Sequence, residues 1–190
     1  RDITMLHDFA KTRRLEFRNA YSHLCPFLSL QQPWETYLQA RSSKLRKNLR
    51  AARKRLESLG TVALKSYRTP DEIEAGFQVV LTLHQHSWKR KKKVEHSESE
   101  AYQRFYREWL ASQAQRGRTR ILALFCNDRP VAATIAFTDA TTYYSAQIVH
   151  DAEFGQCSPG TLLEAAELEG LMRDQEFKTY DFLGSFLNNK

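Results

Sequence analysis

The sequence lacks a long apolar run and is poor in cysteine. No apolar stretch approaches the roughly 20 residues that a membrane-spanning helix needs. The opening Arg-Asp-Ile-Thr does not begin a signal-like segment. The three cysteines, Cys25, Cys126 and Cys157, are far apart and do not have the spacing of a metal site. An odd number of separated cysteines argues against a disulfide framework. We therefore expect a cytoplasmic protein that binds no metal.

Several enzyme signatures are also missing from the sequence. There is no Gly-x-Ser-x-Gly, no phosphate-binding Gly-Lys-Ser/Thr loop and no His-Glu-x-x-His. Internal repeats and low-complexity linkers are missing as well. The 190 residues suffice for one well-buried core but are few for two. We expect a single domain over residues 1–190, in which residues 1–25 are a candidate remainder of an upstream segment.

Positive charge is abundant and unevenly distributed. The formal net charge of +7 predicts anionic partners, such as nucleotide phosphates, nucleic acid or an acidic surface. Residues 41–55 contain no acid. Their basic residues are Arg41, Lys44, Arg46, Lys47, Arg50, Arg53, Lys54 and Arg55. This segment is either a solvated helix face or an electrostatic funnel for nucleotide phosphates, a charged polysaccharide or tRNA.

Hydrophobic periodicity predicts alternating helices and strands. Apolar residues at steps of three and four indicate helices, and alternation indicates half-buried strands. Helices are expected over 34–40, 42–59, 70–88, 102–117 and 159–175, and strands over 61–67, 119–126, 131–138, 142–149 and 178–183. Helices thus precede an antiparallel meander and a β–loop–α–β unit. The predicted fold class is α/β (α+β), a mixed and mostly antiparallel sheet flanked by helices.

The turn Ser158-Pro159-Gly160 begins the helix that follows the 142–149 strand. A helix start presents unpaired N–H groups and the positive end of the helix dipole. These groups suit a pyrophosphate, and Gly160 would let it approach the backbone closely. A simple helix cap is the competing interpretation.

A series of short motifs, in this order, resembles a known family. They are Trp34-Glu35-Thr36-Tyr37-Leu38, the basic segment from Leu45 to Glu57 with Gly60, His84 with Trp88, Arg129-Pro130-Val131-Ala132-Ala133, Tyr143-Tyr144, Ser158-Pro159-Gly160, and Tyr180-Asp181-Phe182-Leu183 with Lys190. The series resembles the GNAT-like acyl-CoA N-acyltransferase domain of cellulose and exopolysaccharide biosynthesis proteins. That group is related to the Fem-type aminoacyl transferases. Residues 156–161 keep part of the usual acyl-CoA signature.

The resemblance implies an acyl-CoA site, with acetyl-CoA as the expected co-substrate. A splayed sheet at the 143–149 strand would pair with the pantetheine arm, which makes Gln147 and Val149 candidate cofactor-binding residues. Ser158, Gly160 and Thr161 would hold the pyrophosphate. The acceptor, a small molecule or a glycan precursor, would enter from the opposite side.

Three residues are candidates for proton transfer: His84, Asp181 and Tyr144. His84 lies on the apolar stripe of its helix and is either a core histidine or a general base. Asp181 either caps a loop or accepts the proton of the acceptor. Tyr143 and Tyr144 point to opposite faces of one strand, so at most one lines the cleft.

Trp88, Tyr143 and Lys190 are the candidate substrate-binding residues. Lys190 either binds an anionic group or is merely solvated. The sequence does not determine the oligomeric state. Two functions stand beside acyl-CoA transfer: a transferase that uses aminoacyl-tRNA, and a non-catalytic module that binds nucleic acid or an anionic surface.

Overall fold

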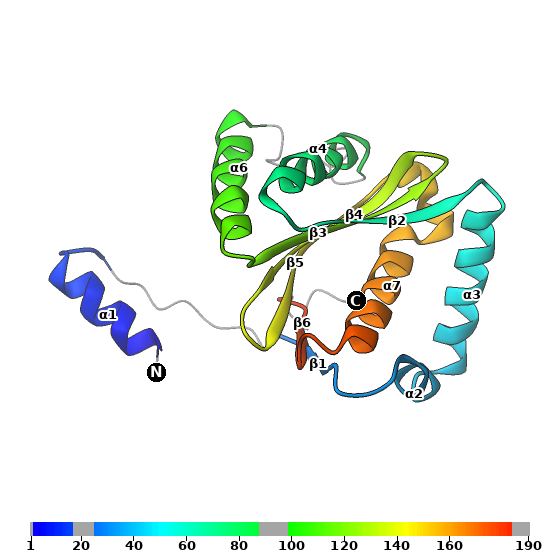
Figure 1. Ribbon diagram of the computed structural model, residues 1–190, viewed down its shortest axis with the longest axis horizontal. Helices are drawn as coiled ribbons and strands as arrows, with labels where there is room; N and C mark the ends of the chain where they lie inside the picture. Colours follow the sequence, from blue (N-terminus) through cyan, green and yellow to red (C-terminus); the bar gives the residue numbers. More distant parts are fainter. Residues whose placement is uncertain (1, 17–24, 88–98, 184–190) are drawn as a thin grey trace.

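The computed structural model describes residues 2–16, 25–87 and 99–183 and shows a six-stranded sheet with the strand order β1-β6-β5-β4-β3-β2 (Figure 1). The strands are β1 (Phe27–Ser29), β2 (Val62–Tyr67), β3 (Thr119–Cys126), β4 (Arg129–Thr138), β5 (Thr142–His150) and β6 (Thr179–Asp181). All neighbours are antiparallel except β5 and β6. The predicted mixed, mostly antiparallel sheet is therefore confirmed.

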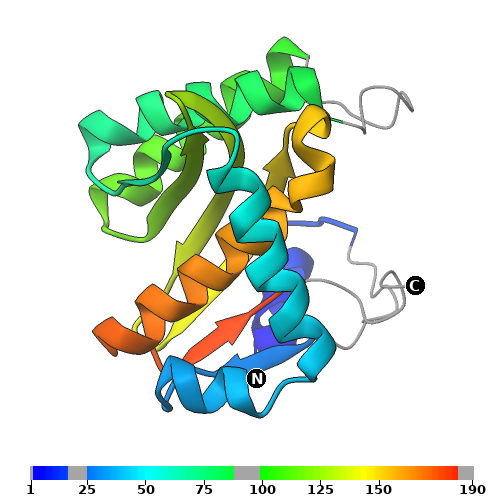
Figure 2. The same cartoon turned by 90° about the vertical axis from the view of Figure 1, so that its right-hand side faces the viewer.

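Helices cover both faces of this sheet. On one face lie α4 (Pro70–His86) and α6 (Glu100–Gln115), and on the other lie α3 (Ser43–Glu57) and α7 (Pro159–Asp174) (Figures 1 and 2). The short α2 (Trp34–Gln39) contacts α7. A 3-10 turn, η1 (Ala152–Cys157), joins β5 to α7, and α1 (Asp2–Thr12) lies apart from these layers in Figure 1. The sequence analysis did not predict α1, β1 or η1.

The core divides into clusters on the two sides of the sheet. Ile73, Phe77 and Val80 of α4 pack against Ile121 and Ile135 of the central strands. On the α7 side, one cluster contains Leu56, Leu124, Val131 and Leu163, and another contains Tyr143, Leu168, Leu171 and Tyr180. An amphipathic helix is stabilised mainly by burying such a face. The spacing of the apolar residues therefore predicted the ends of α3 and α4 to within two residues.

The tight β3–β4 hairpin fixes the register of the central strands. Asn127 and Asp128 have φ of 48° and 63°, and Cys126 pairs with Arg129. Positive φ at both central residues is typical of a type I′ turn, whose twist matches that of the strands. The Asn127 amide oxygen accepts the Thr61 N–H at 2.8 Å, and its nitrogen donates to the Leu59 carbonyl at 3.0 Å. The hairpin thereby also holds the connection between α3 and β2.

Arg46 stabilises the α2–α3 corner. Its Nη1 donates to the carbonyls of Gln39 and Arg41 at 2.6 and 2.8 Å, close to the end of α2. Ser42 caps α3 by accepting the Leu45 N–H at 3.2 Å. One cation of the basic segment therefore has a structural role.

Candidate active site

A fork between β5 and β6 dominates the site. The two strands pair at only three positions, Thr142–Tyr144 with Thr179–Asp181. Beyond Tyr144, β5 continues to His150 with no strand on that side among the described residues. A bulge places Ala146 outside the β4 register, between Ser145 and Gln147. Bulges bend a strand and increase its twist, which accounts for the separation of β5 from β6.

Half of the backbone groups of β5 face this open edge. Asp151 donates its N–H to the Val131 carbonyl at 3.0 Å. Backbone groups alternate in direction along a strand, so those of Gln147 and Val149 also face β4. Those of Ile148 and His150 therefore point into the fork. An extended ligand in the fork would meet these two residues.

The N-terminus of α7 lies beside the same edge. Ser158 is left-handed, with φ 47° and ψ 52°, and its side chain does not cap the helix. Pro159 is the first helical residue, so Gly160 and Thr161 present N–H groups without an intrahelical acceptor. A Cβ on Gly160 would lie 3.6 Å from His150 Nδ1 and 3.7 Å from Ile148 Cδ1. The open edge and the helix start thus meet at Gly160.

Arg129 holds the loop between β5 and α7. It forms ion pairs with Asp151 at 2.5 Å and with Glu153 at 2.6 Å. Asp151 is 1% exposed and also accepts the Glu153 N–H at 2.9 Å. Hydrogen bonds with Glu153 and Asp151 raise the pKa of Arg129 further. This arrangement positions the start of α7 relative to β5.

On the α4 face, His84 is buried and contacts β5. Its exposure is 3%, which confirms the predicted inward orientation. His84 Nε2 lies 2.9 Å from Gln147 Nε2, and the Tyr102 hydroxyl donates to Gln147 Oε1 at 3.2 Å. Because Gln147 uses its oxygen as an acceptor, its nitrogen donates to His84 Nε2, and the imidazole proton belongs on Nδ1. Gln147 thus has a side-chain role next to the bulge, while the Val149 side chain is in the core.

Tyr143 and Tyr144 lie on opposite faces, as predicted. Tyr144 donates to Asp139 Oδ2 at 2.9 Å, and this hydrogen bond raises its pKa. Tyr143 is 2% exposed and donates to Glu167 Oε1 at 2.6 Å. A contact between Tyr143 and substrate would have to break this bond. The roles of both tyrosines stay predictions.

The sequence analysis missed Glu167 of α7. It is 4% exposed and accepts the hydroxyls of Tyr143 at 2.6 Å and Tyr180 at 2.7 Å. Burial raises its pKa to about 7, against the two hydrogen bonds, which lower it. Tyr143 and Tyr180 are register partners at the closed end of the fork. The sequence did contain a pattern that places Glu167 inward, because Leu163, Glu167 and Leu171 recur at steps of four on a buried helix face.

The other predicted residues are more dispersed. Asp181 accepts the Leu183 N–H at 2.8 Å, which is the loop-capping arrangement. Trp88 and Lys190 lie outside the described residues. Within the described part of the chain, no group of three His, Cys, Asp or Glu side chains could hold a metal ion. None of the helices described there is both long and apolar enough to cross a membrane.

The sequence profile of the acetyltransferase (GNAT) domain matches residues 43–188. The chain belongs to this family. The β5–β6 fork lies within the matched residues of this GNAT domain. No curated protein matches the chain.

Solved structures share the fold at low sequence identity. FemX has a TM-score of 0.64 at 11% identity, over 90% of this chain and 56% of that one. L-PGS from Bacillus licheniformis has a TM-score of 0.54 at 16% identity, over 100% and 52%. An aminoglycoside acetyltransferase from an uncultured soil metagenomic sample, in complex with sisomicin, has 0.50 at 7% identity, over 70% and 83%. This GNAT domain spans a little over half the length of FemX and L-PGS.

Proposed function

We propose that the protein transfers an acyl group, in the first instance acetyl, from acyl-CoA to an amine or hydroxyl of its acceptor. The observation that supports this proposal is the meeting of the open β5 edge and the uncapped start of α7 at Gly160. The edge of β5 offers amides and carbonyls to an extended arm, as the pantetheine amides require. The start of α7 offers N–H groups and a positive dipole end to a pyrophosphate. One ligand class, a CoA thioester, has both features.

The residues present fit such a ligand. Ser158 leaves the first amides of α7 uncapped, and Gly160 has no side chain between those amides and the β5 edge. The acceptor nitrogen or oxygen would attack the thioester carbonyl carbon, the C–S bond would break, and the sulfur would leave as a thiolate. The acceptor proton must pass to a base, and the thiolate must be neutralised.

His84, Asp181 and Tyr144 remain our candidates for these proton transfers. Of the three, His84 contacts Gln147, the residue next to the bulge, and the Gln147 amide is hydrogen-bonded to its Nε2. For His84 to act as the base, the acceptor has to take the place of that amide. His84 would then be the base, and the Gln147 amide would cover its Nε2 until the acceptor displaces it.

The first test measures CoA binding by calorimetry and thermal shift in wild type and in Gly160→Ala. We expect micromolar binding to wild type and at least tenfold weaker binding to the variant, because the added methyl group obstructs the phosphate path. The contacts at 3.6 and 3.7 Å are ordinary van der Waals contacts, so the variant should fold with an unchanged Tm. Gly155→Ala is the matched control, since its Cβ would meet nothing within 4 Å. Failure of wild type to bind CoA or acetyl-CoA would overturn the acyl-CoA assignment.

A second test addresses His84. His84→Asn should reduce kcat by about 10²–10³-fold and remove the acidic limb of its pH dependence, because a general base stops accepting protons once it is itself protonated at low pH. His86→Asn on the exposed face of α4 is the control and should leave both unchanged. Unaltered turnover in His84→Asn, with the fold intact, would make His84 a core residue only.

The acceptor is proposed from the resemblance to exopolysaccharide acetyltransferases. A small molecule or a glycan precursor bearing an amine or hydroxyl is the class to screen, with amino sugars first. Cys126 and Cys157 are buried free thiols, as a reducing cytoplasmic setting would keep them, and acyl-CoA chemistry fits that setting.

Aminoacyl-tRNA is the alternative donor, favoured by the charge of α3 and by the shared fold with FemX. Lys44, Lys47 and Lys54 are exposed on this helix. Under this alternative, replacing all three by Gln should reduce the salt dependence of tRNA binding, because fewer counterions are released. A tRNA affinity that exceeds the CoA affinity at physiological salt would move this donor to first place.

A further inference from the structure

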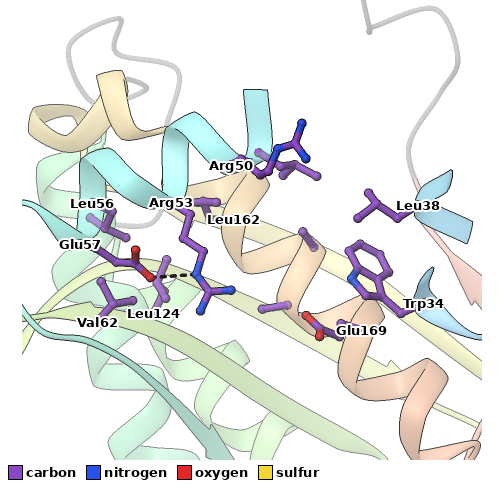
Figure 3. Close-up of a pocket in the computed structure, with 13 residues that line it drawn as sticks. Trp34, Leu38, Arg50, Arg53, Leu56, Glu57, Val62, Leu124, Leu162 and Glu169 are labelled. Carbon is purple, nitrogen blue, oxygen red and sulfur yellow. Dashed lines mark hydrogen bonds and ion pairs between the residues drawn. The ribbon is translucent and has the colours of Figure 1, made fainter. Parts of the chain in front are cut away.

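A second hollow lies beneath α3, away from the fork (Figure 3). Its volume is about 270 Å³, and its walls come from α2, α3, α7, β2 and β3. The floor is apolar and consists of Leu38, Leu49, Leu56, Val62, Leu124, Leu162, Ala165 and Ala166, with Trp34 at one end. Protein interiors leave few voids larger than a water molecule, so an apolar space of this size under an amphipathic helix suits a ligand.

The polar part of the lining is balanced in charge. It contains two guanidinium groups, Arg50 and Arg53, and two carboxylates, Glu57 and Glu169. Arg53 Nε pairs with Glu57 Oε1 at 2.8 Å. The hydrogen bond with Glu57 raises the pKa of Arg53, and the negative charge of Glu169 raises it further. Figure 3 shows Arg53 between the two carboxylates, with Trp34 beside Glu169.

This balance restricts the class of ligand. A simple anion would meet Glu57 and Glu169, and a simple cation would meet Arg50 and Arg53. A zwitterion, with its carboxylate and ammonium a few bonds apart, satisfies both signs at once. The volume of the hollow is small for a ligand pocket, and it suits a molecule the size of one amino acid. The apolar floor then requires an apolar substituent on that zwitterion.

We propose that this hollow binds a free α-amino acid with an apolar side chain. The side chain occupies the space between Leu56, Leu124 and Leu162. The carboxylate lies toward Arg50 and Arg53, and the ammonium lies toward Glu169 and the face of Trp34, which also attracts cations. The site is separate from the fork, and the proposal does not depend on the acyl donor.

The experiment compares L-phenylalanine with two analogues by ligand-observed NMR titration. 3-Phenylpropionate lacks the ammonium group, and phenethylamine lacks the carboxylate. We expect both analogues to bind at least fivefold more weakly than phenylalanine. Glu169→Gln should remove the preference for phenylalanine over 3-phenylpropionate, while Glu108→Gln, an exposed change on α6, should retain it. Equal binding of all three ligands, or none by phenylalanine, would overturn the proposal.

A filling variant tests the location of the site. Ala165→Leu places three additional carbons in the hollow and should abolish phenylalanine binding while keeping or raising the Tm. Ala111→Leu, the same change on the exposed face of α6, is the matched control and should bind as wild type does. Undiminished binding in a folded Ala165→Leu protein would show that the amino acid binds elsewhere.

Discussion

The environment of Glu167 is unlike that of a surface acid, because its side chain is 4% exposed. Its carboxyl group bridges Tyr143 and Tyr180, the paired residues at which the fork closes. Burial dominates its titration and raises the pKa from 4.5 to about 7. The fold therefore favours the protonated acid. The stabilisation is fully present below the unfolded pKa and is lost as pH rises through the folded pKa.

The consequence can be measured by urea unfolding at pH 5 and pH 8. The raised pKa should lower the unfolding free energy of wild type by about 2.5 kcal/mol over this interval, at 1.36 kcal/mol per pKa unit. Glu167→Gln keeps the shape and cannot ionise, so its stability should fall less toward pH 8. Glu108→Gln supplies the baseline for exposed acids. The same pH dependence in Glu167→Gln and wild type would contradict the assignment.

For single residues, the sequence predicted whether a side chain points inward better than it predicted the hydrogen-bond partner of that side chain. The stripe of α4 places His84 inward, and a helical step of four places Glu167 inward as well. Their partners could not be predicted, because they depend on register. Gln147 reaches His84 only because the bulge at Ala146 shifts the alternation of β5 by one residue.

At the scale of elements, the β3–β4 hairpin combines a backbone role and a side-chain role in Asn127. Its left-handed conformation favours Asn or Gly, and its amide bonds Thr61 and Leu59. Asn127→Gly should lose only the hydrogen bonds, about 1 kcal/mol. Asn127→Ala should lose these and also the turn preference, about 2 kcal/mol in total. Chemical unfolding distinguishes the two, and equal losses would mean that the turn conformation contributes nothing.

The elements themselves were largely predictable. Apolar spacing and turn residues gave the α3, α4, α6 and α7 helices and the central strands, since these bury a periodic face. The β1 strand was not predicted, because three residues are too few to show a periodic pattern. Its pairing with β6 also joins segments about 150 positions apart, which no local pattern reveals. The predicted 178–183 strand is shorter in the structure, because β6 ends at Asp181, whose side chain accepts the Leu183 N–H.

At the scale of the whole molecule, the layered body comprises the elements from β1 to β6, and α1 stands apart from it (Figure 1). Met5 and Phe9 of α1 are 71% and 54% exposed. We therefore propose that residues 1–24 are dispensable for the domain. A protein of residues 25–190 should keep its Tm within about 2 °C, because little apolar area is lost from the core. A fall of 5 °C or more in differential scanning calorimetry would show that α1 docks on the body.

The open edge of β5 also has a bearing on handling the protein. Unpaired strand edges are templates on which another extended chain can add. On this edge the backbone of Ile148 offers such a template to an unfolded chain as readily as to a ligand arm. If the fork binds the acyl donor as proposed, that donor would also keep the protein in solution, and the protein would precipitate most readily when it is purified without it.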